Sequence, residues 1–185
     1  ADGASMIDVG GEATNPKVSQ AITVADEIAR VVPVIRAISE NFAIPISIDT
    51  SQPQVMKAAA AAGACLLNDV RAFRVSGALE VAAELQLAVC VMHMGYPFQV
   101  NDGSVDCDLN SIMVFLRQRI QALNQAGLPL ERILIDPGFG GGAFGKSVED
   151  DFAIIRHLRK FAALGCPILV GVSRKSSIGK VLEVA

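Results

Sequence analysis

The sequence has no tryptophan, a single tyrosine, only two histidines and no strong excess of either charge. Sixteen basic and nineteen acidic residues give a formal net charge of -3, whereas a nucleic-acid-binding domain normally carries a basic surface. Aromatic residues make up only 5% of the chain, so few side chains are available for bases to stack on. These scarcities argue against a nucleic-acid partner.

Long uninterrupted apolar runs are also missing, although 51% of the 185 residues are hydrophobic. A membrane-spanning helix needs about 18 or more uncharged apolar residues in a row, and the sequence contains no such stretch. The high apolar content in turn excludes intrinsic disorder, because burying that much surface offsets the entropy lost on folding. We therefore expect a folded domain without a membrane partner.

The cysteine pattern lacks both a disulfide framework and a metal site. None of the four cysteines forms a C-x-x-C pair, and three of them lie in or beside apolar runs, where a free thiol packs like a small hydrophobic side chain. No His, Cys and Glu residues have the spacing of a zinc site. We expect structural cysteines in a reducing cytoplasm and no structural metal.

Short β-branched runs alternate with amphipathic stretches along the whole chain. The expected strands are 5–9, 44–48, 64–68, 88–92, 132–136 and 168–172, and the expected helices are 24–41, 53–62, 77–85, 109–126 and 148–164. Ser51 and Ser147 are candidate N-caps, the second with Asp150 as its capping-box partner. Since a helix connects each pair of strands, the sheet should be parallel, as a doubly wound sheet or as a (β/α)₈ barrel. Without linkers or repeats, residues 1–185 should form one domain.

Polar residues stand where the expected strands end. They are Asp8, Asp49, Asn68, His93 and Asp136, and the last strand runs into Ser173-Arg174-Lys175-Ser176. In α/β proteins this edge of the sheet carries the functional site. Carboxylates, an amide and an ammonium group together suit a flat heterocycle with mixed donors and acceptors, such as a guanine or a pterin. For His93 we expect a histidine whose ring is satisfied by hydrogen bonds.

Residues 140–147 match the G-x-x-x-x-G-K-S pattern of nucleotide-binding phosphate loops. In such a loop, backbone amides would surround the phosphates while Lys146 and Ser147 reached phosphate and Mg²⁺. The chain after Ser147 is long enough for only one more strand, however, and that strand does not end in the metal-binding aspartate that the motif requires downstream. We therefore favour a flexible glycine-rich loop.

Six segments resemble dihydropteroate synthases, in that family's order and at similar spacing. They are IDVGGEATNP at 7–16, IDTS at 48–51, NDV at 68–70, MHM at 92–94, DPGFG at 136–140 and SRKS at 173–176. Pterin-dependent methyltransferases share the barrel and the Asp/Asn/Asp pattern, but the SRKS segment and the glycine-rich loop favour the synthase. The resemblance implies a TIM (β/α)₈ barrel and a transferase of folate biosynthesis, which condenses 7,8-dihydropterin-6-ylmethyl diphosphate with 4-aminobenzoate and releases diphosphate.

The resemblance also implies roles for particular residues. The pterin ring would be held by Asp49, Asn68, Asp136 and Lys175, of which Asp49, Asp136 and Lys175 would act in catalysis. The 4-aminobenzoate site, which sulfonamides also occupy, would be bordered by Thr14, Pro16, Phe144 and Ser176. The family further implies Mg²⁺, here without a protein ligand in this chain, small-molecule substrates, and a cytoplasmic homodimer.

Two departures from the family pattern affect these expectations. Six expected strands are fewer than the eight of a closed barrel, so we expect the chain to be part of a protein of roughly 250 or more residues. Asn15 stands where the family usually has an arginine that helps to hold diphosphate. That change leaves open a non-catalytic pterin-binding homologue as an alternative to the enzyme.

Overall fold

The structure, a computed structural model, describes residues 3–13, 22–94, 108–140, 144–173 and 175–182. Its strands are β1 (Ile7–Gly10), β2 (Ile46–Asp49), β3 (Leu66–Asp69), β4 (Ala88–Met92) and β5 (Ile133–Asp136). Its helices are α1 (Val24–Asn41), α2 (Pro53–Ala62), α3 (Ala78–Leu85), α4 (Leu109–Gln125), α5 (Val148–Arg156), α6 (Leu158–Phe161) and α7 (Ser176–Leu182), with 3₁₀ turns η1 (Leu130–Arg132) and η2 (Ala162–Leu164).

The five strands form one parallel sheet in the order β1-β2-β3-β4-β5. A strand order identical to the chain order confirms the expected α/β class and corresponds to part of a barrel, whereas a doubly wound sheet reverses its order. The sixth expected strand, 168–172, makes only an isolated parallel bridge between Ile135 and Ile168. It continues the sheet beside β5 without becoming a regular strand.

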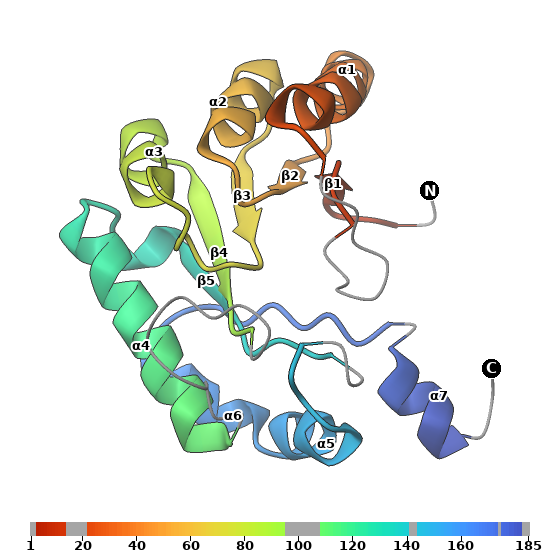
Figure 1. Ribbon diagram of the computed structural model, residues 1–185, viewed down its shortest axis with the longest axis vertical. Coiled ribbons are helices and arrows are strands. Elements are labelled where there is room, and N and C mark those ends of the chain that lie inside the picture. Colours follow the sequence, from red (N-terminus) through yellow and green to blue (C-terminus); the bar gives the residue numbers. More distant parts are fainter. Residues whose placement is uncertain (1–2, 14–21, 95–107, 141–143, 174, 183–185) are drawn as a thin grey trace.

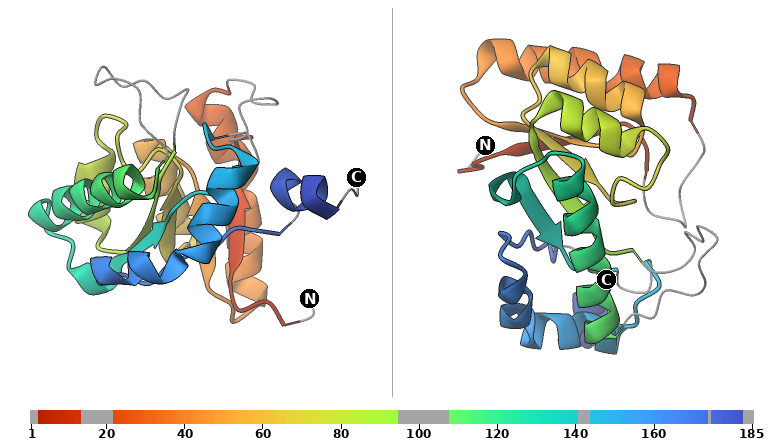
Figure 2. Two further views of the ribbon diagram at one scale, coloured as in Figure 1. Left: turned by 90° about the horizontal axis from the view of Figure 1, so that it is seen from below. Right: turned by 90° about the vertical axis from the view of Figure 1, so that its left-hand side faces the viewer.

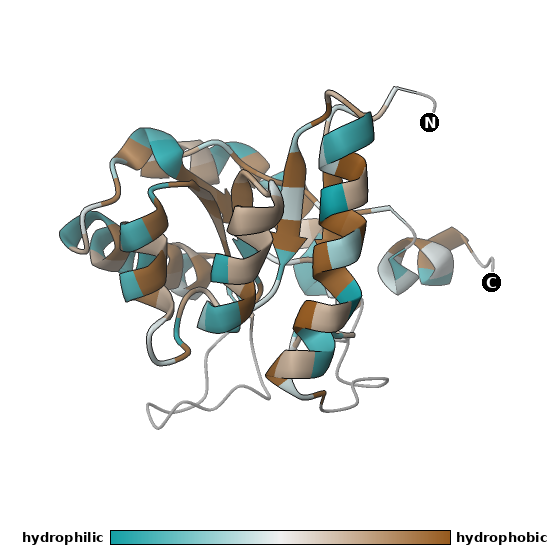
Figure 3. Cartoon of the chain, turned by 90° about the horizontal axis from the view of Figure 1, so that it is seen from above, coloured by the Kyte–Doolittle hydropathy of each residue, from teal (hydrophilic) through white to brown (hydrophobic). Residues whose placement is uncertain are grey.

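Helices lie along the outside of the strands, as Figure 1 shows for α1 to α4 and Figure 2 shows from two other directions. Strand side chains that face these helices are fully buried, among them Ile48, Leu67, Val91 and Ile135. They pack with one apolar stripe of each helix, and in Figure 3 hydrophobic and hydrophilic residues alternate along the helices accordingly. The core therefore lies between sheet and helices, and the other face of the sheet carries polar side chains beside buried apolar ones such as Leu66, Cys90 and Met92.

The helix ends follow the expected capping chemistry at one site and depart from it at another. The Ser147 hydroxyl accepts a hydrogen bond from the Asp150 amide at 3.1 Å, and the Asp150 carboxylate accepts one from the Ser147 amide at 2.8 Å, so the capping box is confirmed. The prediction for Ser51 was wrong. Gln52 is the N-cap of α2, and the Ser51 hydroxyl instead donates to the buried carboxylate of Asp69.

The expected helix 148–164 is divided into α5, α6 and η2, because the backbone leaves helical geometry at His157. Within the described ranges, no helix combines the length and the apolar character that crossing a membrane requires.

Candidate functional site

The register of the sheet puts three of the predicted site residues on the face opposite the helices. Asp49 pairs with Asn68, Asn68 pairs with Cys90, and Met92, two residues after Cys90, pairs with Asp136. Because strand side chains alternate with a period of two, Asp49, Asn68, Cys90 and Asp136 all point to the same side. Each lies at or near the carboxyl end of its strand, which confirms that one edge of the sheet gathers them.

Asp49 occupies a negative environment at the end of β2. The pKa of its carboxyl group is raised from 3.8 to about 7, chiefly by burial and further by the charges of Asp8, Asp69 and Glu27, with Arg71 acting in the opposite direction. Its buried Oδ1 atom has no hydrogen-bond partner among the described residues. A buried acceptor in that condition is one that a donor on a ligand would satisfy.

Asn68 and Asp8 extend this group across the neighbouring strands. The Asn68 amide nitrogen donates to Asp8 Oδ2 at 3.4 Å, a long hydrogen bond between β3 and β1. Asp8 is exposed and Asn68 half-buried, so both are within reach of a ligand at this edge of the sheet.

Asp136 ends β5 and forms a second group with the loop that follows. Its Oδ1 accepts a hydrogen bond from the Gly138 amide at 2.7 Å. The pKa of Asp136 is raised to about 6, because burial outweighs the Gly138 hydrogen bond and the charges of Lys146 and Lys175, which all act to lower it. Two cations therefore lie near this carboxylate, whereas Asp49 has mostly anions around it.

Lys175 lies close enough to Asp136 to lower that residue's pKa, on the side where the sequence placed it, and it also lies over the ring of Phe144, which the sequence did not predict. Its ammonium nitrogen is 5.6 Å from the centre of that ring, a cation–π contact, and the ring is buried. Ser176 begins α7 and is exposed. Thr14, Pro16 and Asn15 lie outside the described residues.

Lys146 is a residue that the sequence interpretation assigned to a flexible loop. Its side chain is instead buried, with 1% of its surface exposed, and its ammonium donates to the backbone carbonyl of His93 at 3.0 Å. The expected flexible loop over 140–147 therefore has two buried side chains, Phe144 and Lys146, while residues 141–143 lie outside the described residues. The phosphate-loop motif was the only signal in the sequence that marked this lysine.

Asp151 and Ser177 hold the surrounding loops together. The buried carboxylate of Asp151 accepts hydrogen bonds from the Gly140 amide at 3.1 Å and from the Ser177 hydroxyl. Asp151 on α5 thereby connects the glycine-rich loop to α7, the helix directly after Lys175. Neither residue was marked by the sequence analysis.

Cys90 lies between the two carboxylate groups. Burial raises the pKa of its thiol, and Asp136, Asp8 and Asp49 add to that shift, so the thiol stays protonated at neutral pH. Cys65 and Cys166 are free thiols as well. Cys90 and Cys166 are buried and pack as small apolar groups, whereas Cys65 is exposed.

His93 differs from its prediction. It lies on the helix side of the sheet, where its ring meets Phe115 of α4 edge to face at 5.0 Å. Both ring nitrogens are buried without a hydrogen-bond partner among the described residues, and burial lowers the pKa of His93 to about 3. The expectation of a hydrogen-bonded histidine was therefore wrong. His93 is a neutral packing residue.

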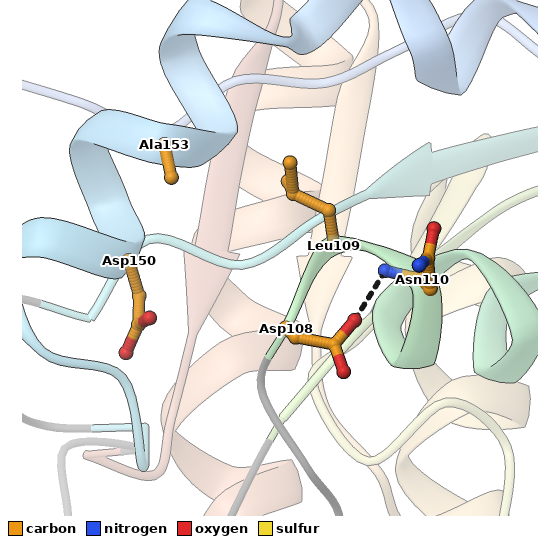
Figure 4. A pocket seen from close by; sticks show the side chains of 5 residues that line it. All are labelled: Asp108, Leu109, Asn110, Asp150 and Ala153. Carbon is orange, nitrogen blue, oxygen red and sulfur yellow. Dashed lines mark hydrogen bonds between the residues drawn. The ribbon is translucent and has the colours of Figure 1, made fainter.

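A cavity of about 400 Å³ opens between the starts of α4 and α5 (Figure 4) and is lined by Asp108, Leu109, Asn110, Asp150 and Ala153. Its two carboxylates cap helices. Asp108 accepts from the Asn110 and Ser111 amides at 2.6 and 3.1 Å, and Asp150 accepts from Ser147. This cavity therefore offers little free polar chemistry. Across the described ranges, no three His, Cys, Asp or Glu side chains come together as a metal site.

Comparison with known proteins agrees with this geometry. The model of the family described as pterin binding enzymes matches residues 1–185, so the chain belongs to that family. Within it, the chain is similar to dihydropteroate synthases. That of Escherichia coli K12 is 41% identical over 184 residues, which are 98% of this chain and 64% of the relative.

Two solved structures of the Xanthomonas albilineans dihydropteroate synthase are also similar. The one with 4-aminobenzoic acid has a TM-score of 0.88 and 44% identity, covering 98% of this chain and 63% of that one. The complex with 7,8-dihydropteroate has a TM-score of 0.84 and 42% identity at the same coverage, 98% and 63%. The chain thus spans a little under two thirds of the proteins that it matches.

Proposed function

We propose that residues 1–185 form one pterin-binding barrel domain of a dihydropteroate synthase. The reaction joins the amine of 4-aminobenzoate to the methylene carbon of a dihydropterin-6-ylmethyl diphosphate. A carbon–nitrogen bond forms, the bond from carbon to the diphosphate oxygen breaks, and the amine loses a proton. The observation that carries the proposal is the placement of Asp49, Asn68 and Asp136 on one face of the sheet, in a chain whose whole length matches the pterin-binding family.

The pterin ring would be bound by groups that the site leaves available. The unpartnered Oδ1 of Asp49 would accept a hydrogen bond from a ring N–H or the amino group, and Asn68 can both donate and accept at the next edge. Lys175, whose ammonium lies over the ring of Phe144, would donate to a ring nitrogen or the carbonyl oxygen. Such charge-assisted hydrogen bonds are stronger than neutral ones.

The chemistry needs electrostatic stabilisation more than proton transfer. As diphosphate leaves, positive charge develops on the pterin methylene, and the carboxylates of Asp49 and Asp136 stabilise it. The aminobenzoate amine then attacks a carbon already short of electrons, so no strong base is required. The substrate 4-aminobenzoate would lie along Thr14, Pro16, Phe144 and Ser176, and sulfonamides would compete with it for this site.

We also propose Mg²⁺ as a cofactor, a cytoplasmic location and a homodimer, each on the strength of the family resemblance. The described residues do not form a metal-binding cluster, so none of them is assigned to Mg²⁺ and no step above depends on it. Free thiols at Cys65, Cys90 and Cys166 are compatible with a reducing compartment.

Calorimetry with the pterin diphosphate, followed by an assay of diphosphate release with 4-aminobenzoate, tests the proposal on the full chain. We expect micromolar binding that Asp136→Asn weakens strongly, and that Glu80→Gln on the exposed side of α3 leaves unchanged. The alternative, a pterin-binding homologue without turnover, is motivated by Asn15. Tight binding without diphosphate release would favour it, and absent pterin binding would refute both.

A further inference from the structure

An ion pair spans the carboxyl end of β2, the strand that carries Asp49. Glu12 follows β1 and Arg71 follows β3, and these two strands flank β2 in the sheet. The two Arg71 terminal nitrogens donate to the two Glu12 carboxylate oxygens at 3.1 and 3.0 Å. Only 15% of the Arg71 side chain and 12% of the Glu12 side chain are exposed. A two-bond pair of this kind fixes orientation as well as distance.

Both ends of this pair are held by their own elements. On the β3 side, the fully buried carboxylate of Asp69 accepts hydrogen bonds from the Arg71 amide at 2.8 Å and from the Phe73 amide at 2.6 Å, which fixes the turn that presents Arg71. The Asp69 carboxylate also accepts a hydrogen bond from the hydroxyl of Ser51, which lies two residues after the end of β2.

On the β1 side, the backbone before Glu12 is pressed against α1. A Cβ atom at Gly11 would lie 2.9 Å from both Glu27 Cγ and Val31 Cγ1, so only glycine allows this approach. Arg30 adds a hydrogen bond to the Gly11 carbonyl at 3.0 Å. Glu12 therefore meets Arg71 from a backbone that has little freedom to move.

The charge of Arg71 opposes a concentration of carboxyl groups. The groups that act on Asp49 are Asp8 from β1, Asp69 from β3 and Glu27 from α1, all acidic, together with Arg71. Arg71 also lowers the pKa of Asp69 and of Glu27, while burial, the larger effect, raises both. Losing this cation would thus favour the protonated form of several carboxyl groups at once.

We propose that Arg71 is a positioning residue for pterin binding: paired with Glu12 across the end of β2, it fixes the two segments that flank Asp49. The inference rests on the proposed function, because it assigns to Asp49 the role of accepting hydrogen bonds from the pterin. It adds a residue that does not itself touch the substrate.

Variants of Arg71 separate its charge from its geometry. Arg71→Gln removes both, so the Asp49 carboxyl should titrate about half a unit to one unit higher than in the unmodified chain. Arg71→Lys retains the charge but loses the two-bond pairing, so it should leave that midpoint nearly unchanged. Carbon-13 NMR of labelled aspartate carboxyls in the full chain, assigned with Asp49→Asn, measures the midpoint without any ligand. Arg117→Gln, on the exposed side of α4, is the matched control.

Pterin diphosphate binding, measured by calorimetry between pH 6 and 9, gives the second readout. Binding to the ionised carboxylate weakens as pH falls through the Asp49 midpoint, so Arg71→Gln should move this loss to higher pH. Arg71→Lys should weaken binding about fivefold or more at every pH, since a misplaced acceptor loses its alignment. Glu12→Gln should resemble Arg71→Lys.

The outcomes distinguish the two proposals. An unchanged Asp49 midpoint in Arg71→Gln, or unchanged pterin affinity in Arg71→Lys, would overturn the inference about Arg71. If Arg71→Gln does not fold, the Arg71→Lys affinity decides. A shifted midpoint in a chain that never binds the pterin would refute the proposed function and still support the electrostatic role of Arg71.

Discussion

Replacing Asp49 with asparagine should make the protein more stable while it abolishes the candidate function. The carboxyl of Asp49 has an ordinary pKa of 3.8 and a pKa of about 7 in the folded chain. Its Oδ1 atom has no hydrogen-bond partner among the described residues, so Asp49→Asn removes a charge without breaking a bond to that atom. The charged form of Asp49 thus destabilises the folded state, and a ligand that donates hydrogen bonds to it would offset that cost.

The sign of the pH dependence follows from proton binding. Between pH 4 and pH 7 the folded chain holds a proton on Asp49 that the unfolded chain has released, so raising the pH in this window destabilises the fold. The stabilising contribution is fully present below pH 4 and is lost once the pH passes about 7. A shift of about three units corresponds to about 4 kcal/mol, and because Asp49 retains some contact with water we expect about 2–4 kcal/mol.

Urea unfolding at pH 4 and pH 8.5, followed by circular dichroism, measures the effect. Asp49→Asn should gain about 2–4 kcal/mol at pH 8.5 and less than about 1 kcal/mol at pH 4. Equal gains at the two pH values would refute the reasoning, because a packing effect has no reason to depend on this titration. Loss of stability at pH 8.5 would show that the charged carboxylate is satisfied in the folded state.

Asp69→Asn is the matched comparison, because it removes the same charge from the next strand. The Asp69 carboxylate accepts hydrogen bonds from the Ser51 hydroxyl and from the amides of Arg71 and Phe73. An asparagine cannot serve all three donors with its single oxygen. This variant should therefore lose about 2–4 kcal/mol at pH 8.5, the opposite sign from Asp49→Asn.

Three further predictions concern the second group of site residues. Lys175→Ala should weaken pterin binding about 10- to 150-fold by calorimetry, since a charge-assisted hydrogen bond contributes about 1.5–3 kcal/mol, whereas Lys180→Ala should change it little; equal small effects would remove Lys175 from the site. Lys146→Met should cost about 1–3 kcal/mol in urea unfolding, because it leaves the His93 carbonyl unpaired, and an unchanged midpoint would contradict that bond's importance. Gly138→Ala should lower the free energy of unfolding by more than about 3 kcal/mol, since its φ is 75° and a Cβ would lie 2.1 Å from the His93 carbonyl oxygen. Gly171→Ala, with open space around it, is the control. Similar losses in both variants would refute the steric argument.

The elements that the sequence predicted best are those with strong local signals. The bounds of α1, α2 and β4 were predicted to the residue, because continuous apolar periodicity or a buried strand composition defines them without reference to distant parts of the chain. The other strands begin one or two residues later than predicted. Residues 168–172 have strand composition, but β5 is their only strand neighbour in the described chain, and strand formation depends on such partners.

The same distinction between local and distant signals applies to the site. Asp49, Asn68 and Asp136 could be found because each lies at or next to the end of a strand, and parallel strands in chain order bring their ends to one edge. Arg71 and Glu12 are 59 residues apart, and Lys146 and His93 are 53 apart. Their pairing depends on which loops meet above the sheet, and no local pattern encodes that.

The glycine-rich motif illustrates why a pattern needs its structural context. A phosphate loop uses its lysine and serine for a ligand, and both must therefore be left without partners by the protein. In this chain the Ser147 hydroxyl caps its own helix, and the Lys146 ammonium is buried against the His93 carbonyl near Asp136. The two groups that would bind phosphate are already used to build the loop beside Asp136. Lys146 and Ser147 therefore stabilise the loop beside the candidate pterin site. This assignment rests on hydrogen bonding and burial, which the sequence motif alone does not reveal.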